Sequence, residues 1–148
     1  MIVITNNPVQ TKKLGVYFAK KIMREKNKKT LVLGLKGDLG GGKTTFLQGF
    51  TKGLGIKQRI LSPTFVILKR FKIKDLRFKN FYHIDCYRLN RDKEILALGF
   101  KEIILDSENI VAIEWAERIK KILPKNTIWI KFEFIDENKR KVRIEHKF

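Results

Sequence analysis

The chain has 148 residues, of which 43% are apolar and 11% aromatic. A chain of this size and composition buries a core, which excludes a disordered tail and predicts a single domain over residues 1–148. Its one cysteine, Cys86, excludes an internal disulfide, and no cluster of histidine and cysteine has zinc-ligand spacing. No apolar run approaches the ~18 residues of a membrane-spanning helix, and residues 1–5 are too short for a secretory signal. We therefore expect a cytoplasmic protein with no membrane partner.

The sequence is strongly basic. It holds 33 lysines and arginines against 15 acidic residues, a net charge of +18, and residues 1–100 carry 22 of these cations with only 6 acids. Such a charge attracts polyanions: a nucleotide, RNA or an acidic partner. AT-biased codon usage is the alternative explanation, because 24 of the 33 cations are lysine and no aromatic-interleaved RNA motif accompanies them.

Strands and helices alternate in the first part of the chain. Asn7 can cap a helix whose first position is Pro8, and Leu14, Phe18 and Ile22 then recur at helical spacing. The predicted elements are a strand at residues 1–5, a helix from Asn7 to about Lys26, a buried strand at Thr30–Leu35, and a helix at Thr45–Leu54 that Gly55 ends.

The second part mixes short helices with strands and closes on a clean alternation of apolar and polar residues, with Ile128, Ile130, Phe132 and Phe134 on one face. The predicted elements are strands at Ser62–Leu68 and Phe81–Tyr87 joined by an exposed basic turn at Lys69–Lys79, short helices at Asp92–Leu98 and Phe100–Leu105 around Gly99, a buried strand at Asn109–Glu114, a helix at Trp115–Leu123, and a hairpin with a turn at Asp136–Lys139 and a last strand at Val142–His146. We expect a three-layer α/β fold with a mixed central sheet flanked by helices and a C-terminal β-hairpin.

A phosphate-binding loop follows the second strand. The segment from Gly37 to Thr44 matches G-x4-G-K-[ST], between an apolar strand and a helix, as in P-loop NTPases. Its glycines can adopt backbone angles denied to other residues, so that amides point at phosphates; Lys43 supplies a positive charge and Thr44 a hydroxyl for Mg²⁺. The predicted nucleotide-binding residues are Gly37, Gly40, Gly41, Gly42, Lys43, Thr44 and Thr45. The Asn-Lys-x-Asp motif of guanine-specific proteins is missing from the sequence, which favours ATP.

Two acidic residues end apolar strands. Glu114 ends one strand and Asp85 another, and a parallel sheet brings such ends to the edge that holds the phosphate loop. Either carboxylate is a candidate to hold Mg²⁺ or orient water, with an ordinary surface carboxylate as the alternative. Thr64, after Ser62 and Pro63, is a candidate switch hydroxyl for the γ-phosphate or simply the start of a strand.

Five short motifs in fixed order then resemble one family. They are Gly37-Asp-Leu-Gly-Gly-Gly-Lys-Thr-Thr45, Ser62-Pro-Thr-Phe65, Tyr82-His-Ile-Asp-Cys-Tyr-Arg-Leu89, Leu98-Gly99 and Ile113-Glu-Trp115. In this order they resemble the TsaE (YjeE) family, and the resemblance covers nearly the whole chain.

The resemblance implies a bacterial ATPase required to make N6-threonylcarbamoyladenosine at position 37 of tRNAs that read ANN codons. It implies ATP and Mg²⁺ as cofactors, the TsaB–TsaD heterodimer as partner with TsaC upstream, and hydrolysis that is slow alone and activated by the partner. The high net charge makes the basic surface a candidate for tRNA contact, with codon bias as the alternative. Carried over by motif, Lys43, Asp85 and Glu114 are the catalytic candidates, with Asp85 as either a catalytic or a metal-linked acid. Thr44 and Glu114 bind Mg²⁺, the segment Ser62–Thr64 with the Thr64 hydroxyl forms the switch, Trp115 lies near the nucleotide, and Arg140 is a candidate to contact it.

Three features depart from the family pattern: Gly41 stands where Ala is usual, Cys86 where Leu is common, and the net charge is high. Two rival functions remain. One is a small-molecule kinase, which needs a substrate pocket and an arginine-rich lid. The other is a nucleotide-sensing RNA-binding module, which the charge favours.

Overall fold

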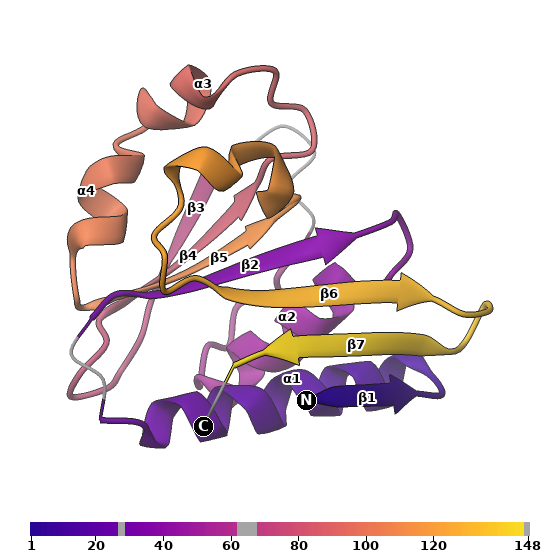
Figure 1. Cartoon of the computed structure of the whole chain (residues 1–148). Helices are drawn as coiled ribbons and strands as arrows, with labels where there is room; N and C mark the ends of the chain where they lie inside the picture. Colours follow the sequence, from indigo (N-terminus) through magenta and orange to yellow (C-terminus); the bar gives the residue numbers. More distant parts are fainter. Residues whose placement is uncertain (27–28, 62–67, 147–148) are drawn as a thin grey trace. The chain divides into compact units, whose positions relative to one another are not determined.

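The structure is a computed structural model that describes residues 1–26, 29–61 and 68–146. Its elements in chain order are β1 (Ile2–Thr5), α1 (Pro8–Arg24), β2 (Leu31–Gly37), α2 (Lys43–Gly53), β3 (Leu68–Lys72), β4 (Asn80–Asp85), α3 (Asp92–Leu96), α4 (Phe100–Leu105), β5 (Asn109–Glu114), the 3₁₀ helix η1 (Ala116–Ile122), β6 (Ile128–Phe134) and β7 (Arg140–Glu145), drawn in Figure 1. In the described part of the chain, no helix is long and apolar enough to cross a membrane.

Hydrogen bonds link the strands in the order β1-β7-β6-β2-β5-β4-β3. The pairs β2–β5 and β5–β4 are parallel, whereas β1–β7, β6–β7 and β3–β4 are antiparallel. The predicted mixed sheet with flanking helices and a closing hairpin is therefore confirmed.

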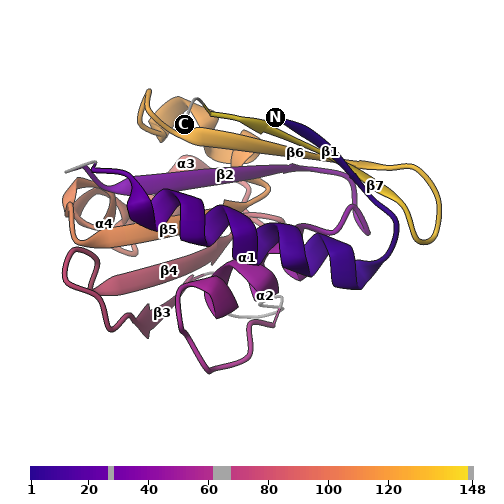
Figure 2. The ribbon, with the colours of Figure 1, turned by 90° about the horizontal axis from the view of Figure 1, so that it is seen from below.

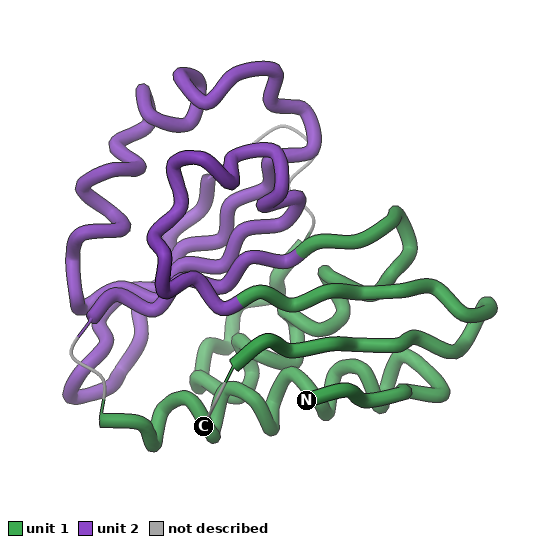
Figure 3. Tube along the Cα trace, viewed as in Figure 1, with its two compact units in different colours: residues 1–27, 36–61, 129–148 green, residues 28–35, 62–128 purple. Residues whose placement is uncertain are grey.

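The chain divides into two compact units, which Figure 3 colours separately. The first unit contains residues 1–27, 36–61 and 129–148, and the second contains residues 28–35 and 62–128. The phosphate loop belongs to the first unit, and the strands that end in Asp85 and Glu114 belong to the second. The single domain expected over residues 1–148 stays a prediction.

In the first unit, α1 and α2 pack side by side, as Figure 2 shows. The predicted cap holds, because the Asn7 side chain accepts a hydrogen bond from the backbone N–H of Gln10 at 2.9 Å. The rings of Phe18, Phe46 and Phe50 lie 6.0 to 6.4 Å from one another, and Phe46 meets Phe132 of β6 edge-on at 5.5 Å. This aromatic cluster holds α2, and with it the start of that helix at the phosphate loop.

Two glycines allow the close approach of these helices. A Cβ at Gly49 would lie 1.8 Å from the backbone oxygen of Lys12, and one at Gly15 would lie 2.1 Å from the backbone oxygen of Phe46. Both positions exclude any larger residue while the helices keep this spacing.

The second unit is built on β2, β5 and β4, and all six residues of β5 are buried. Here the exposed turn predicted for Lys69–Lys79 is wrong in its first part. Strand β3 runs to Lys72, and Phe71 and Ile73 point into the core at 5% and 6% exposure. In this segment apolar residues alternate with basic ones at the two-residue period of a strand, and burial of the apolar face favours a strand although the segment is highly charged. The turn itself is shorter, and the Asp75 carboxylate accepts from the backbone N–H groups of Arg77 and Phe78.

The helix predicted at Trp115–Leu123 is a 3₁₀ helix over Ala116–Ile122 with non-helical angles at Ile119. Trp115 stands outside it in the left-handed region, at φ 57°. The other boundaries shift by a residue or two: α2 begins at Lys43 rather than Thr45, and β7 begins at Arg140 rather than Val142.

The closing hairpin has the predicted turn. The Asp136 carboxylate accepts from the backbone N–H groups of Asn138 and Lys139 at 2.8 Å each, and these bonds lower its pKa, with the Lys139 bond as the largest cause. Phe134, the last residue of β6, is 51% exposed, and the Arg140 guanidinium lies 4.7 Å from the centre of its ring.

Candidate nucleotide site

The phosphate loop has the backbone conformation that its glycines allow. Gly37, Gly40 and Gly42 have φ of 135°, 74° and 96°, angles that L side chains rarely adopt. Gly41 has no positive φ. It is constrained by space instead, because an added Cβ would lie 3.0 Å from the oxygen of Asp38 and 3.2 Å from the Cβ of Phe132. At Gly40 an added Cβ would meet nothing within 4 Å, so this part of the loop is open to a ligand.

Lys43 ties the loop together. Its side chain is buried, and its ammonium donates to the backbone oxygens of Gly37 at 2.5 Å and Asp38 at 2.9 Å. The same residue starts α2, whose first N–H groups and positive dipole end face the loop, while Thr44 and Thr45 follow half-buried in its first turn. An ammonium, helix amides and a hydroxyl at one place form a site suited to an anion.

Arg140 braces this loop from the start of β7. Its Nε donates to the backbone oxygen of Gly40 at 2.7 Å, and its guanidinium also donates to the backbone oxygens of Asp136 and Lys139 in the hairpin turn. The guanidinium therefore links the closing hairpin to the glycine loop. Its predicted contact with the nucleotide stays a prediction.

The two candidate acids of the second unit are direct neighbours. In the parallel register Glu114 pairs with Asp85 on one side and with Leu35 on the other, so the three residues end their strands at one level. Two residues beyond Leu35, β2 passes into the phosphate loop at Gly37. The two acids therefore lie side by side at the carboxyl ends of parallel strands; their predicted place beside the phosphate loop stays a prediction.

Glu114 is paired with a histidine that the sequence analysis did not single out. Its Oε2 lies 2.7 Å from Nε2 of His83, and the two side chains are only 4% and 2% exposed. A carboxylate this deeply buried needs a polar partner, and His83 provides one. His83 stands two residues before Asp85 on the same face of β4, a spacing that could have identified it.

Asp85 is half-buried and shapes its own turn. One carboxylate oxygen of Asp85 accepts a hydrogen bond from the backbone N–H of Tyr87 at 2.9 Å. The backbone N–H of Cys86 donates to the backbone oxygen of Glu114 at 3.0 Å. The Cys86 thiol between them is buried, and burial, followed by the nearby Asp85 charge, raises its pKa to about 12. It is a packing residue, consistent with an apolar replacement for leucine.

Trp115 follows Glu114 directly. It is the one non-glycine residue with positive φ in the described ranges, and its ring packs 5.1 Å from that of Tyr87, with the Arg118 guanidinium 5.8 Å from the Trp115 ring centre. Backbone strain of this kind persists only where the surroundings enforce it, and it concentrates at functional sites. Thr64 and all but the last residue of the strand predicted at Ser62–Leu68 lie outside the described residues.

Each unit, taken by itself, offers an oxygen ligand of the kind that Mg²⁺ prefers. Mg²⁺ takes oxygen ligands and commonly binds through one or two protein groups together with substrate phosphates and water. The Thr44 hydroxyl and the Glu114 carboxylate are ligands of that type. Among residues 1–26, 29–61 and 68–146, no three His, Cys, Asp or Glu side chains gather as an all-protein metal site, and a nucleotide-borne ion does not require one.

Comparison with known proteins gives a consistent result. A family model described as "Threonylcarbamoyl adenosine biosynthesis protein TsaE" matches residues 5–142. The protein named "tRNA threonylcarbamoyladenosine biosynthesis protein TsaE" from Rickettsia felis is 39% identical over 140 residues, which cover 94% of this chain and 76% of that protein. Its namesake from Bacillus subtilis is 36% identical over 141 residues, 93% of this chain and 80% of that one.

A solved structure agrees. The crystal structure of Bacillus subtilis YdiB matches with a TM-score of 0.70 and 30% identity, over 97% of this chain and 83% of that one. This likeness confirms the predicted α/β P-loop fold, a mixed sheet flanked by helices.

Proposed function

Because the chain belongs to the TsaE family of threonylcarbamoyl adenosine biosynthesis proteins, we propose that it is a Mg²⁺-dependent ATP-binding protein and a slow ATPase. Its role in the tRNA modification is to support formation of N6-threonylcarbamoyladenosine at position 37 of tRNAs that read ANN codons. The observation that carries the ATP assignment is the glycine loop whose backbone oxygens hold the buried Lys43 ammonium at the start of α2.

Each residue of the loop has a role that follows from its chemistry. ATP bound here would supply a transferable γ-phosphoryl group, with Mg²⁺ to neutralise its charge. The loop amides from Gly40 to Gly42 would donate to phosphate oxygens, that of Gly41 in place of its 3.1 Å bond to the backbone oxygen of Asp38. The Lys43 ammonium would stabilise the charge that develops on the β,γ-bridge. Thr44 offers a hydroxyl ligand to the ion. Gly37 and Thr45 complete the loop, and Arg140 holds it in shape through the oxygen of Gly40.

The acids of the second unit have separate roles in this proposal. Glu114 provides a carboxylate ligand for Mg²⁺, directly or through water, and His83 fixes the orientation of that carboxylate. Asp85 orients or deprotonates the attacking water. Trp115 lies near the nucleotide, and Thr64 acts as the switch hydroxyl. These roles rest on the match of each residue to the family motif and on the burial and hydrogen bonds described above.

The partner in this proposal is the TsaB–TsaD heterodimer, in the cytoplasm, with TsaC acting upstream. Phosphoryl transfer to water depends on positioning and on neutralising charge, so a site that a partner completes hydrolyses ATP slowly by itself. A turnover that rises when TsaB–TsaD is added is the expected behaviour.

The test is calorimetric titration of ATP with Mg²⁺ into the wild type, Lys43→Ala and Lys20→Ala. Lys20 is an exposed lysine of α1 in the same unit, so it controls for the loss of one charge. We expect saturable heat for the wild type and for Lys20→Ala, and none for Lys43→Ala. A folded wild-type protein that gives no heat overturns the assignment, and phosphorylation of an added small-molecule acceptor would favour a kinase instead.

A further inference from the structure

A hollow lies in the first unit, beside α2. Its volume is about 650 Å³, and it is lined by Lys12 of α1, by Gln48, Thr51 and Lys52 of α2 and by the segment 55–60. The phosphate loop meets α2 at Lys43, roughly 7.5 Å along the helix axis from Gln48. The hollow is therefore a neighbour of the phosphate loop that is built from other residues.

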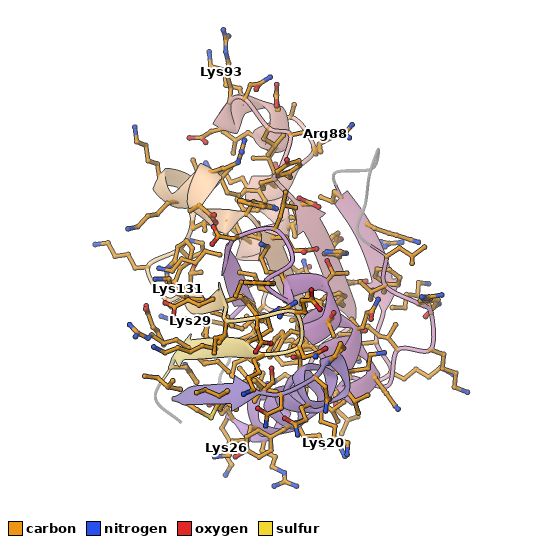
Figure 4. All side chains as sticks on the ribbon, turned by 90° about the vertical axis from the view of Figure 1, so that its right-hand side faces the viewer. Lys20, Lys26, Lys29, Arg88, Lys93 and Lys131 are labelled. Atoms are coloured by element: carbon orange, nitrogen blue, oxygen red, sulfur yellow. The ribbon has the colours of Figure 1, made fainter. Side chains whose placement is uncertain are left out.

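The hollow is lined by unpaired positive charge. Lys12, Lys52, Lys57 and Arg59 all line it and are all exposed, and no acidic residue is among its lining. Within the described part of the chain, none of the four forms a salt bridge. The sequence explains why, since residues 39–74 contain eight cations and no acid. Figure 4 labels lysines elsewhere on the surface, among them Lys20, Lys26 and Lys93, whereas these four cations line one depression.

The wall of the hollow is fixed rather than loose. The backbone N–H of Ile56 donates to the oxygen of Thr51 at 3.0 Å, and Gly55 takes the left-handed conformation that ends α2, at φ 80°. The Gln48 side chain donates to the backbone oxygen of Ile60 at 3.0 Å, and Ile56 and Ile60 are buried beneath the loop. The loop that carries Lys57 and Arg59 is therefore held in place before any ligand arrives, which lowers the entropy cost of binding.

We propose that this basic hollow binds the phosphate backbone of RNA. The proposal rests on the proposed function, which makes tRNA the relevant polyanion. Cations on flexible stems that contact phosphates are the main source of RNA affinity. An acidic protein partner fits less well, because protein interfaces are anchored by aromatic and apolar side chains and are depleted in lysine. Among the described residues, no aromatic side chain lines the hollow, so the contacts that these residues offer are to phosphates, which carry no base sequence.

The test measures binding of a fluorescent, unmodified tRNA transcript by anisotropy between 50 and 200 mM salt. The variant carries K12Q, K52Q, K57Q and R59Q. Its matched control carries K93Q, K101Q, K120Q and K125Q, four exposed lysines of the second unit, so that both lose the same charge. Circular dichroism and ATP calorimetry confirm that each variant is folded, and we expect both to bind ATP like the wild type.

Each phosphate contact contributes about 0.7 to 0.9 to the slope of log K against log salt. Four contacts therefore contribute about 3 to this slope. The fourfold variant of the hollow is expected to lose that part of the slope and at least about tenfold in tRNA affinity at 100 mM salt. The fourfold control variant is expected to change little in either quantity. The single variant Lys57→Gln is expected to reduce the slope by about 1. A scrambled RNA of equal length is expected to bind like the tRNA transcript.

Three outcomes overturn the proposal: no tRNA binding by the wild type at 50 mM salt, equal losses in the two fourfold variants, or tighter binding of polyglutamate than of tRNA in the same hollow. Failure of the proposed function is a different result, the loss of ATP heat in the wild type, and it is read from the calorimetry independently of RNA.

Discussion

Replacing His83 with leucine is expected to destabilise the protein, because it leaves the buried Glu114 carboxylate without the imidazole 2.7 Å away. Leucine has a volume close to that of histidine, so the effect is not one of a cavity. At 2% and 4% side-chain exposure, water has little access to replace the lost partner. Removing one partner of a buried ion pair costs about 3–5 kcal/mol, and removing one partner of a buried neutral hydrogen bond costs about 1–3 kcal/mol. We therefore expect the free energy of unfolding to fall by at least about 2 kcal/mol.

The assay is urea unfolding of a double-mutant cycle: wild type, His83→Leu, Glu114→Leu and the double variant. Replacing both partners of a buried pair by apolar residues is often nearly neutral, so the double variant should be more stable than the sum of the two single losses implies. We expect a coupling free energy above about 1 kcal/mol. Additive losses, or a His83→Leu loss below about 1 kcal/mol, would refute the idea that the pair stabilises the fold.

The same pair has a functional readout. His83→Gln keeps a side-chain N–H donor, so it should retain more of the Mg²⁺-dependent ATP affinity than His83→Leu does at a urea concentration where both are folded. If His83 served only to fill space, the two variants would bind Mg²⁺ and ATP equally well. Calorimetry with and without Mg²⁺ separates the two results.

Three further predictions concern other parts of the molecule. Gly49→Ala would place a Cβ 1.8 Å from a backbone oxygen of α1, so the helices must separate, and a melting temperature lowered by at least about 4 °C is expected; an unchanged value would show that the crossing tolerates a methyl group. Arg140→Gln removes the bond to the oxygen of Gly40 and should weaken ATP binding by about threefold to tenfold in calorimetry, whereas Arg143→Gln, an exposed change on the same strand, should not. Burial raises the pKa of the Cys86 thiol from 9.0 to about 12, so the thiol should react with iodoacetamide at pH 8 about a thousandfold more slowly in the native protein than in urea. The contribution of the protonated thiol to the free energy of unfolding is full below pH 9 and is lost as the pH rises toward 12. Rapid labelling of the native protein would contradict the burial of Cys86.

Much of the fold could be predicted because it depends on short segments whose own residues determine the local backbone conformation. The helix end at Gly55, the hairpin turn at Asp136 and the phosphate loop each depend on a few consecutive residues whose backbone conformation their chemistry decides. The buried strands could be predicted because Thr30–Leu35 and Asn109–Glu114 are apolar runs of strand length. These features needed no knowledge of what packs against them.

The errors arose where two signals compete. In the stretch after Leu68, charge indicated a turn while the alternation through Phe71 and Ile73 indicated a strand, and burial of the apolar face decided the outcome. A helix was predicted to start at Trp115, but the chain leaves β5 through a left-handed residue at Trp115 and continues as a 3₁₀ helix. A residue that rarely adopts positive φ gives no local signal for it, because the surrounding structure imposes the conformation.

The pairing of His83 with Glu114 depends on strand register, which is a property of two segments about 30 residues apart. Pairing Asp85 with Glu114 puts His83 on the same face, one step back along β4, within hydrogen-bond distance of the carboxylate. A slip of one residue would turn His83 to the other face of the sheet and leave Glu114 buried without it. The register that brings Asp85 and Glu114 side by side therefore also gives the buried Glu114 carboxylate its hydrogen bond to His83. Stability of the sheet and orientation of the proposed metal ligand are set by the same pairing, so a substitution that disturbs one must disturb the other.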